Sequence, residues 1–157
     1  MKKICLLATG GTIASEAGAN GLRPQVAADR MLRLLPELKE VCQIEYRELM
    51  SLDSSNLLPE HWQRMACSVA ELREDYDGFV ISHGTDTMAY SASALYYMLE
   101  NIDRPVVLTG AQIPIEDPRT DGKRNLLTAF RAAASGRPGV YLASDGRIIQ
   151  GNRVKKL

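Results

Sequence analysis

The chain has no net charge and few aromatic side chains. Nineteen Lys and Arg residues are balanced by nineteen Asp and Glu residues, and only two phenylalanines and one tryptophan occur among 157 residues. A surface that binds nucleic acid needs clustered basic side chains to neutralise phosphates, and no basic stripe runs through this sequence. We therefore expect no nucleic-acid partner, and the hydrophobic fraction of 45% is that of an ordinary globular domain.

Long hydrophobic runs are also absent. No apolar stretch approaches the roughly 20 residues that a membrane-spanning helix requires, so we expect no membrane role. The apolar run that follows Lys2 and Lys3 leads at once into a Thr-Gly-Gly-Thr turn, so it is too short for the core of a secretory signal peptide. The sequence therefore predicts a cytoplasmic protein.

Cysteine and histidine are too sparse for a disulfide framework or a metal site. Cys5, Cys42 and Cys67 form no CxxC pair and have no histidine nearby, so we expect buried free thiols. His61 and His83 stand alone, and we expect neither a metal nor a cofactor. A dinucleotide is disfavoured because the glycine turn after the first apolar run lacks the third glycine of a GxGxxG fingerprint.

What the sequence does contain is an alternation of strand and helix patterns. Short apolar runs predict buried strands at residues 4–8, 78–82, 106–109 and 139–142, with weaker strand patterns at 45–49 and 147–150. Helical patterns occupy residues 28–35, 59–75, 87–100 and 122–134. This alternation predicts one α/β domain over residues 1–157, with a doubly wound, mostly parallel sheet and helices on both faces.

Two polar segments interrupt the alternation. Residues 15–26 are rich in Gly, Ala and Asn, and residues 111–121 are rich in Pro, Asp and Thr, so both are predicted as loops over the strand ends. The first loop is long enough to predict a mobile lid that becomes ordered around a ligand. Residues 151–157 contain no helix stop or turn signal, and we expect a further domain outside the chain.

The first glycine turn places Thr12 directly after two glycines and a predicted strand. Glycines at a strand end let the backbone approach a ligand and leave N–H groups open. A hydroxyl beside such N–H groups is the arrangement of a nucleophile with an oxyanion hole. A Gly-Gly-Thr sequence is equally typical of a plain strand-to-loop turn in which Thr12 bonds its own backbone, so both interpretations stay open.

A second glycine turn follows the strand predicted at residues 78–82 and contains Thr85 and Asp86. A carboxylate beside a hydroxyl at a helix N-terminus orients an ammonium group or accepts a proton. Either side chain is also a suitable N-cap for the helix expected near Thr87. Capping does not explain why a histidine, two threonines and an aspartate all gather at one strand end.

A third polar segment, containing Asp53, Ser54 and Ser55, lies between the strand pattern at 45–49 and the helix expected at Pro59. These side chains suit the head group of an amino acid, because hydroxyls bind a carboxylate and an aspartate binds a cation. An Asx or Ser turn at the start of the helix is also compatible with this stretch.

The motifs as a set resemble those of the bacterial asparaginase family, in particular its short cytoplasmic type, type I. Residues 9–14, TGGTIA, are similar to the first family signature, and residues 83–90, HGTDTMAY, are similar to the second and more specific one. Residues 108–114 and the segment from 145 to 156 also look like family segments, so the resemblance covers the whole chain. It implies the N-terminal catalytic domain of such an enzyme.

The resemblance implies a role for each matched residue. Thr12 would attack the side-chain amide of L-asparagine, releasing ammonia and forming an ester that water converts to L-aspartate. Thr85, Asp86 and Lys156 match the group that polarises the threonine hydroxyl and assists proton transfer. The substrate would contact the other matched residues, which are Gly11, Asp53, Ser54, Ser55, Gly84 and Ala111.

Two features depart from the family pattern. Many members carry a tyrosine after the first threonine that hydrogen-bonds the nucleophile, whereas the corresponding stretch here contains Leu22. We expect Leu22 to shield the site without replacing the tyrosine hydroxyl. Family members also continue into a smaller C-terminal domain, and they are dimers or tetramers in which that domain lends residues to a neighbouring subunit. The resemblance therefore implies a homo-oligomer, of which this chain contains only the larger domain.

Three other hypotheses stay open from the sequence. One is the asparaginase-like subunit of an archaeal tRNA-dependent amidotransferase, which shares both threonine signatures but has an extra region before the first strand. Another is a periplasmic asparaginase-glutaminase, which the missing signal peptide disfavours. The third is a ligand-binding domain that keeps the pocket and hydrolyses nothing.

Overall fold

The protein folds around a single mixed sheet, described by a computed structural model that covers residues 1–11 and 24–156. Within these ranges, six strands lie in the order β2-β1-β3-β4-β5-β6. The neighbours from β2 to β5 pair in parallel and β6 is antiparallel to β5. This confirms the predicted α/β class. The strands are β1 (Lys3–Ala8), β2 (Gln43–Glu48), β3 (Gly78–Ser82), β4 (Pro105–Thr109), β5 (Gly139–Ser144) and β6 (Arg147–Gln150).

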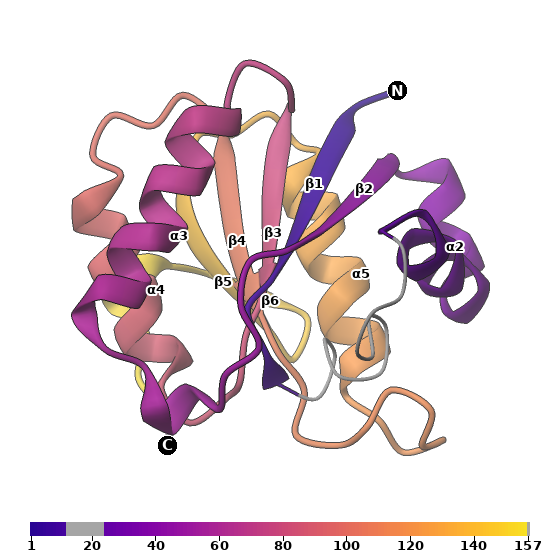
Figure 1. Cartoon of the computed structure of the whole chain (residues 1–157). Coiled ribbons are helices and arrows are strands. Elements are labelled where there is room, and N and C mark those ends of the chain that lie inside the picture. Colours follow the sequence, from indigo (N-terminus) through magenta and orange to yellow (C-terminus); the bar gives the residue numbers. More distant parts are fainter. Residues whose placement is uncertain (12–23, 157) are drawn as a thin grey trace.

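Helices cover both faces of the sheet (Figure 1). One face packs against α2 (Pro24–Leu34) and α5 (Gly122–Ala133), and the other packs against α3 (Pro59–Leu72) and α4 (Met88–Met98). Central strands are buried on both faces because successive side chains alternate between the two layers. In β1, Ile4 and Leu6 join the core on the α5 side, while Cys5 and Leu7 join the core on the α4 side.

No helix within the described ranges is long and apolar enough to cross a membrane. Three short 3-10 helices complete the described structure, and they span Pro36–Glu40, Ser54–Asn56 and Gly151–Arg153.

The start of α2 differs from the prediction. The helix begins at Pro24, so residues 24–26 are helical and the predicted loop over residues 15–26 was wrong at its end. Proline suits the first turn of a helix because its missing N–H has no intrahelical partner there. The Gly- and Asn-rich residues before Pro24 obscured this start signal.

The helix predicted from Thr87 is α4, but its capping differs from the alternative considered. Its N-cap is Thr87, so the alternative of Thr85 or Asp86 as the cap was wrong. The Thr87 side chain does not cap the helix, and its hydroxyl instead donates a 2.7 Å hydrogen bond to the Ser54 carbonyl oxygen. Thr87 therefore ties the second glycine turn to the Asp53 segment, which leaves Thr85 and Asp86 free of a capping role.

The thiols divide into two kinds. Cys5 and Cys42 are buried as predicted, and burial raises the pKa of their thiols to about 12 and about 11 respectively. Cys67 is exposed, which corrects the prediction of a third buried thiol. Met65 and Val69 form the buried face of α3, and Cys67 falls midway between them on the helix and thus on its outer side.

Candidate active site

Three turns meet at the carboxyl ends of β1, β3 and β4. Ser82 of β3 pairs with Ala8 of β1 and with Thr109 of β4, so the turns that follow these strands begin at the same level. The chain passes from β1 to β2 on one side and then crosses back to form β3 on the other side, because β1 lies between β2 and β3 in the sheet. Such a switch point is where open α/β sheets bind ligands.

The turns after β1 and β3 approach each other, and the Asp53 segment that follows β2, through glycine backbone. Gly11 has a φ of +80°, and a Cβ there would lie 2.7 Å from the Gly84 nitrogen. A Cβ on Gly84 would in turn lie 2.9 Å from Ser54 Oγ. No larger residue fits at Gly11 without moving backbone, so the glycines allow the three polar segments found in the sequence to touch.

The meeting point is hollowed on the surface. An open cavity of about 630 Å³ lies over the strand ends. Of the residues predicted to contact a substrate, all but Ser55 line it, together with Thr85 and Asp86 from the second glycine turn. The predicted lining residues are Gly11, Asp53, Ser54, Gly84, Thr85, Asp86 and Ala111.

Lys156 reaches this region from the other end of the sequence. Its Nζ lies 3.2 Å from Asp86 Oδ1 and 3.5 Å from Thr85 Oγ1. The side chains of Lys156 and Asp86 are 44% and 67% exposed, so the ion pair lies at the rim of the site. A second cavity of about 310 Å³, lined in part by Lys156, shares Thr85 and Gln112 with the first.

The Asp53 segment forms an Asx turn. Asp53 Oδ1 accepts hydrogen bonds from the Ser55 backbone N–H at 2.9 Å and from the Ser55 hydroxyl at 2.7 Å, and these bonds lower the pKa of the Asp53 carboxyl. The Ser55 hydroxyl is therefore bound to Asp53, and Ser55 is not among the residues that line the cavity. Ser54 is buried, and its Oγ accepts a 3.3 Å hydrogen bond from the Thr87 N–H.

The loop over residues 111–121 is held by two side chains that the sequence did not single out. Asp121 accepts hydrogen bonds from the backbone N–H groups of Gln112 and Ile113, at 3.0 and 3.1 Å. Asn125 donates to the Gly110 carbonyl at 2.8 Å. Asp121 stands just before α5, but nothing in the spacing of Asn125 signals a contact with Gly110.

His83 is buried beside the site, with 1% of its surface exposed. Its Nε2 lies 2.7 Å from Ser91 Oγ and its Nδ1 lies 2.5 Å from the Gly84 carbonyl oxygen. Burial lowers the pKa of the imidazole below its ordinary value, and the hydrogen bond to Gly84 opposes this effect. His83 is therefore neutral at physiological pH.

The lowered pKa of His83 predicts a loss of stability in mild acid. The unfolded chain takes up a proton near pH 6.5 and the folded chain does so only at lower pH, so acidification favours unfolding in that window. We expect the free energy of unfolding, measured by urea titration, to fall between about pH 7.5 and pH 5.5. His83→Gln removes the titrating group, so an equal fall in this variant would contradict the assignment.

A methyl group on Gly84 is expected to destabilise the protein. Gly84→Ala places a Cβ 2.9 Å from Ser54 Oγ and 3.0 Å from Ser54 Cβ, and overpacking of this kind costs about 1–3 kcal/mol. Urea unfolding of Gly84→Ala, Ser54→Gly and the double variant forms a mutant cycle. Ser54→Gly removes both clashing atoms, so the double variant should recover part of the loss. Additive effects of the two substitutions would contradict the predicted clash.

Some predictions lie outside the described residues. Thr12, the predicted nucleophile, and Leu22, at the place of the family tyrosine, are both in the range 12–23, which the structure does not describe. The same holds for most of the predicted lid. These remain predictions from the sequence, while Gly10 and Gly11 bring the described chain to the edge of the cavity just before Thr12.

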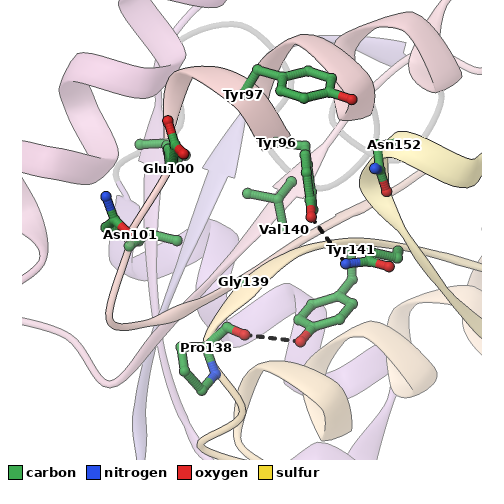
Figure 2. Close-up of a pocket in the computed structure, with 12 residues that line it drawn as sticks. Tyr96, Tyr97, Glu100, Asn101, Pro138, Gly139, Val140, Tyr141 and Asn152 are labelled. Atoms are coloured by element: carbon green, nitrogen blue, oxygen red, sulfur yellow. Dashed lines mark hydrogen bonds between the residues drawn. The ribbon is translucent and has the colours of Figure 1, made fainter.

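Another hollow, of about 540 Å³, lies away from these turns (Figure 2). It is lined by Tyr96 and Tyr97 of α4 and by Tyr141 of β5, beside Pro138. The Tyr141 hydroxyl donates to the Pro138 carbonyl at 2.8 Å, and the Gln150 amide donates to Tyr96 Oη at 3.1 Å. Pro138 precedes the amino end of β5, so this hollow does not belong to the strand-end site.

Comparison with known proteins identifies the family of this chain. Residues 3–157 match the family "Asparaginase, N-terminal", and the chain belongs to this family. It is 44% identical over 156 residues to an L-asparaginase of Thermococcus kodakarensis, covering 99% of this chain and 48% of that protein. The crystal structure of L-asparaginase I from Vibrio cholerae superposes with a TM-score of 0.85 at 41% identity, covering 99% of this chain and 48% of that one.

A second group of relatives is named as amidotransferase subunits and not as L-asparaginases. The chain is 36% identical over 167 residues to a glutamyl-tRNA(Gln) amidotransferase subunit of Methanococcus maripaludis, covering 100% of this chain and 40% of that protein. The chain spans about half the length of the L-asparaginases that it matches. These matches confirm the resemblance to the asparaginase family that the two glycine turns indicated, and they extend it over nearly the whole chain.

Proposed function

We propose that this chain is the larger domain of an amidohydrolase that converts L-asparagine and water to L-aspartate and ammonia. One observation carries the proposal. Thr85, Asp86 and Lys156 come together beside the Gly11 turn at a strand-end cavity, in a chain that belongs to the asparaginase family. The domain boundary at residues 1–157, a cytoplasmic location and a homo-oligomeric state are parts of the same proposal.

The reaction proceeds in two balanced steps. The Thr12 hydroxyl oxygen attacks the side-chain amide carbon, and the hydroxyl proton passes to the leaving nitrogen. The carbon–nitrogen bond then breaks, so that ammonia departs and an ester of Thr12 remains. Water then attacks the ester carbon, and the Thr12 hydroxyl and L-aspartate are released. Gly10 and Gly11 line the cavity, and a backbone N–H of this turn suits the negative charge that forms on the amide oxygen.

Thr85, Asp86 and Lys156 handle protons in both steps. The ammonium of Lys156 lies within reach of Asp86 Oδ1 and Thr85 Oγ1, so it polarises the hydroxyl and is itself held by the carboxylate. A polarised hydroxyl beside the reacting atoms relays a proton between the nucleophile and water or ammonia. The ion pair at the rim sets the charge state that this relay needs.

The polar groups around the cavity suit the head group of an amino acid. The carboxylates of Asp53 and Asp86 line it and favour an α-ammonium group, while the Ser54 side chain and the glycine N–H groups favour an α-carboxylate. The Ala111 segment, whose position is fixed by Asn125 and Asp121, lies where the side-chain amide would reach.

Ammonia release is the test of this function. The native protein should release ammonia from L-asparagine, and a parallel assay with L-glutamine measures side-chain selectivity. Residues 1–157 alone should be less active, because a further domain completes the site in our proposal. A native protein that binds L-asparagine and releases no ammonia would contradict the proposal and favour a ligand-binding domain.

A second candidate function follows from the relatives named as amidotransferase subunits. In that case ammonia release would depend on a charged tRNA and a partner protein. Steady hydrolysis of free L-asparagine by the purified protein alone would exclude the amidotransferase function. Ammonia release that occurs only after glutamyl-tRNA and the amidotransferase partner are added would favour it over the asparaginase function.

A further inference from the structure

A row of hydrogen-bonded side chains connects α3 with the second glycine turn. Trp62 Nε1 on α3 lies 2.7 Å from Ser91 Oγ on α4, and the same oxygen lies 2.7 Å from His83 Nε2. His83 Nδ1 is 2.5 Å from the Gly84 carbonyl oxygen. Ser91 and His83 are 0% and 1% exposed, so the bond between them is shielded from water, while the bonds to Trp62 and to Gly84 are partly buried. Trp62 is the only tryptophan of the chain.

The chemistry of the end groups fixes the direction of every hydrogen. An indole N–H can only donate and a carbonyl oxygen can only accept. Trp62 therefore donates to Ser91, and His83 carries its hydrogen on Nδ1 and donates it to Gly84. The Nε2 of His83 is left as an acceptor for the Ser91 hydroxyl. All hydrogens point from Trp62 toward Gly84, and aligned bonds of this kind strengthen one another.

The carbonyl at the end of the row belongs to the peptide group that joins Gly84 to Thr85. A peptide group is planar, so the direction of the carbonyl also fixes the direction of the Thr85 N–H and the starting point of its side chain. Gly84 has no side chain of its own to restrict its backbone, although Gly11 and Ser54 confine it on two sides. His83 therefore supplies the directional restraint on this peptide.

We propose that Trp62, Ser91 and His83 form a positioning relay that orients Thr85 for the reaction by holding the Gly84 carbonyl. The proposal rests on the function proposed above, because it assumes that Thr85 takes part in turnover. None of the three relay residues lines either of the two cavities at the strand ends, so each acts through the Gly84–Thr85 peptide and not on a substrate. They are positioning residues.

Two substitutions at His83 separate the two ends of the imidazole. His83→Asn places an amide nitrogen close to the position of Nδ1 and keeps a donor for Gly84, whereas His83→Gln places its amide near Nε2 and keeps only the contact with Ser91. We expect His83→Asn to keep kcat within a few fold of wild type. We expect His83→Gln to lower kcat by about 10- to 100-fold with KM little changed, because small misplacements of a reacting group cost this much.

The relay also has a signature that requires no turnover. The chain has one other histidine, His61. Its Nδ1 accepts a 2.8 Å hydrogen bond from the Leu58 N–H, so the neutral form of His61 carries its hydrogen on Nε2. Nitrogen NMR should therefore find opposite tautomers, Nδ1–H for His83 and Nε2–H for His61. An Nε2–H tautomer for His83, or a doubly protonated ring at neutral pH, would overturn the relay.

The experiment distinguishes failure of the relay from failure of the proposed function. Equal losses of kcat in His83→Asn and His83→Gln, in an active wild-type background, would show a merely structural histidine and overturn the relay. A wild-type protein without asparaginase activity would contradict the proposed function alone. The relay is then decided by the His83 tautomer and by the Thr85 amide shift, which should move in His83→Gln and stay in place in His83→Asn.

Discussion

Replacing Thr85 with valine is expected to lower kcat for L-asparagine by about 10³-fold or more. The substitution keeps the shape of a side chain that lines both strand-end cavities, and it removes the hydroxyl that accepts from Lys156. Loss of a group that transfers protons in both steps raises both barriers, far beyond the effect of one lost hydrogen bond. Ammonia release from the native protein and its variant, at saturating L-asparagine, measures the effect.

Folding should change little in this variant. Thr85 lies in a turn at the strand end and is partly exposed, so valine removes no core volume. Thr128→Val is the matched control, because the Thr128 hydroxyl donates to the Arg124 carbonyl of its own helix and Thr128 lines neither strand-end cavity in the part of the chain that the structure describes. Near-normal turnover in Thr85→Val, or an equal loss in Thr128→Val, would contradict the role of Thr85.

The sheet could be predicted because its strands are buried on both faces. Such strands are continuous apolar runs, so β1, β3 and β4 stand out in the sequence within a residue or two of their observed ends. The β2 strand, near the edge of the sheet, is mostly exposed and gives a weaker pattern. The start of α2 was missed because the signal at Pro24 follows a stretch without periodicity. The N-cap of α4 was missed because Thr87 uses its hydroxyl for a tertiary contact.

The candidate site could be predicted in part for a related reason. Glycine turns after buried strands mark the strand ends, and parallel strands bring those ends to one edge, so Gly11, Gly84 and Thr85 follow from local pattern. Lys156 is 70 residues from Asp86 along the chain, and no local pattern connects them. Only the resemblance to the asparaginase family placed Lys156 in the site, and the structure brings its ammonium within 3.2 Å of Asp86 Oδ1.

The partners of buried polar side chains could not be predicted from the sequence. Asn125 bonds the Gly110 carbonyl, and Ser91 bonds both Trp62 and His83. Yet Asn125 and Ser91 occupy ordinary helical positions. A serine or asparagine on the buried side of a helix reveals that it needs a partner, because an unsatisfied polar group there is costly. Which partner it finds depends on the packing of helices against the sheet.

Replacing Lys156 with methionine is expected to lower kcat by about 10²-fold or more while leaving stability almost unchanged. Methionine keeps much of the aliphatic stem and removes the ammonium that lies 3.2 Å from Asp86 and 3.5 Å from Thr85. The ion pair is largely exposed, and exposed pairs contribute only about 0–1 kcal/mol to folding. A large effect on turnover with a small effect on unfolding would therefore indicate a chemical role.

Lys155→Met is the matched control for Lys156→Met, because it removes the same charge from the neighbouring exposed residue, for which no ion pair is found within the described ranges. Kinetics and urea unfolding of both variants measure the two effects. Equal kinetics in the two variants would reduce Lys156 to a surface charge and leave Thr85 and Asp86 without the cation that we assign to them.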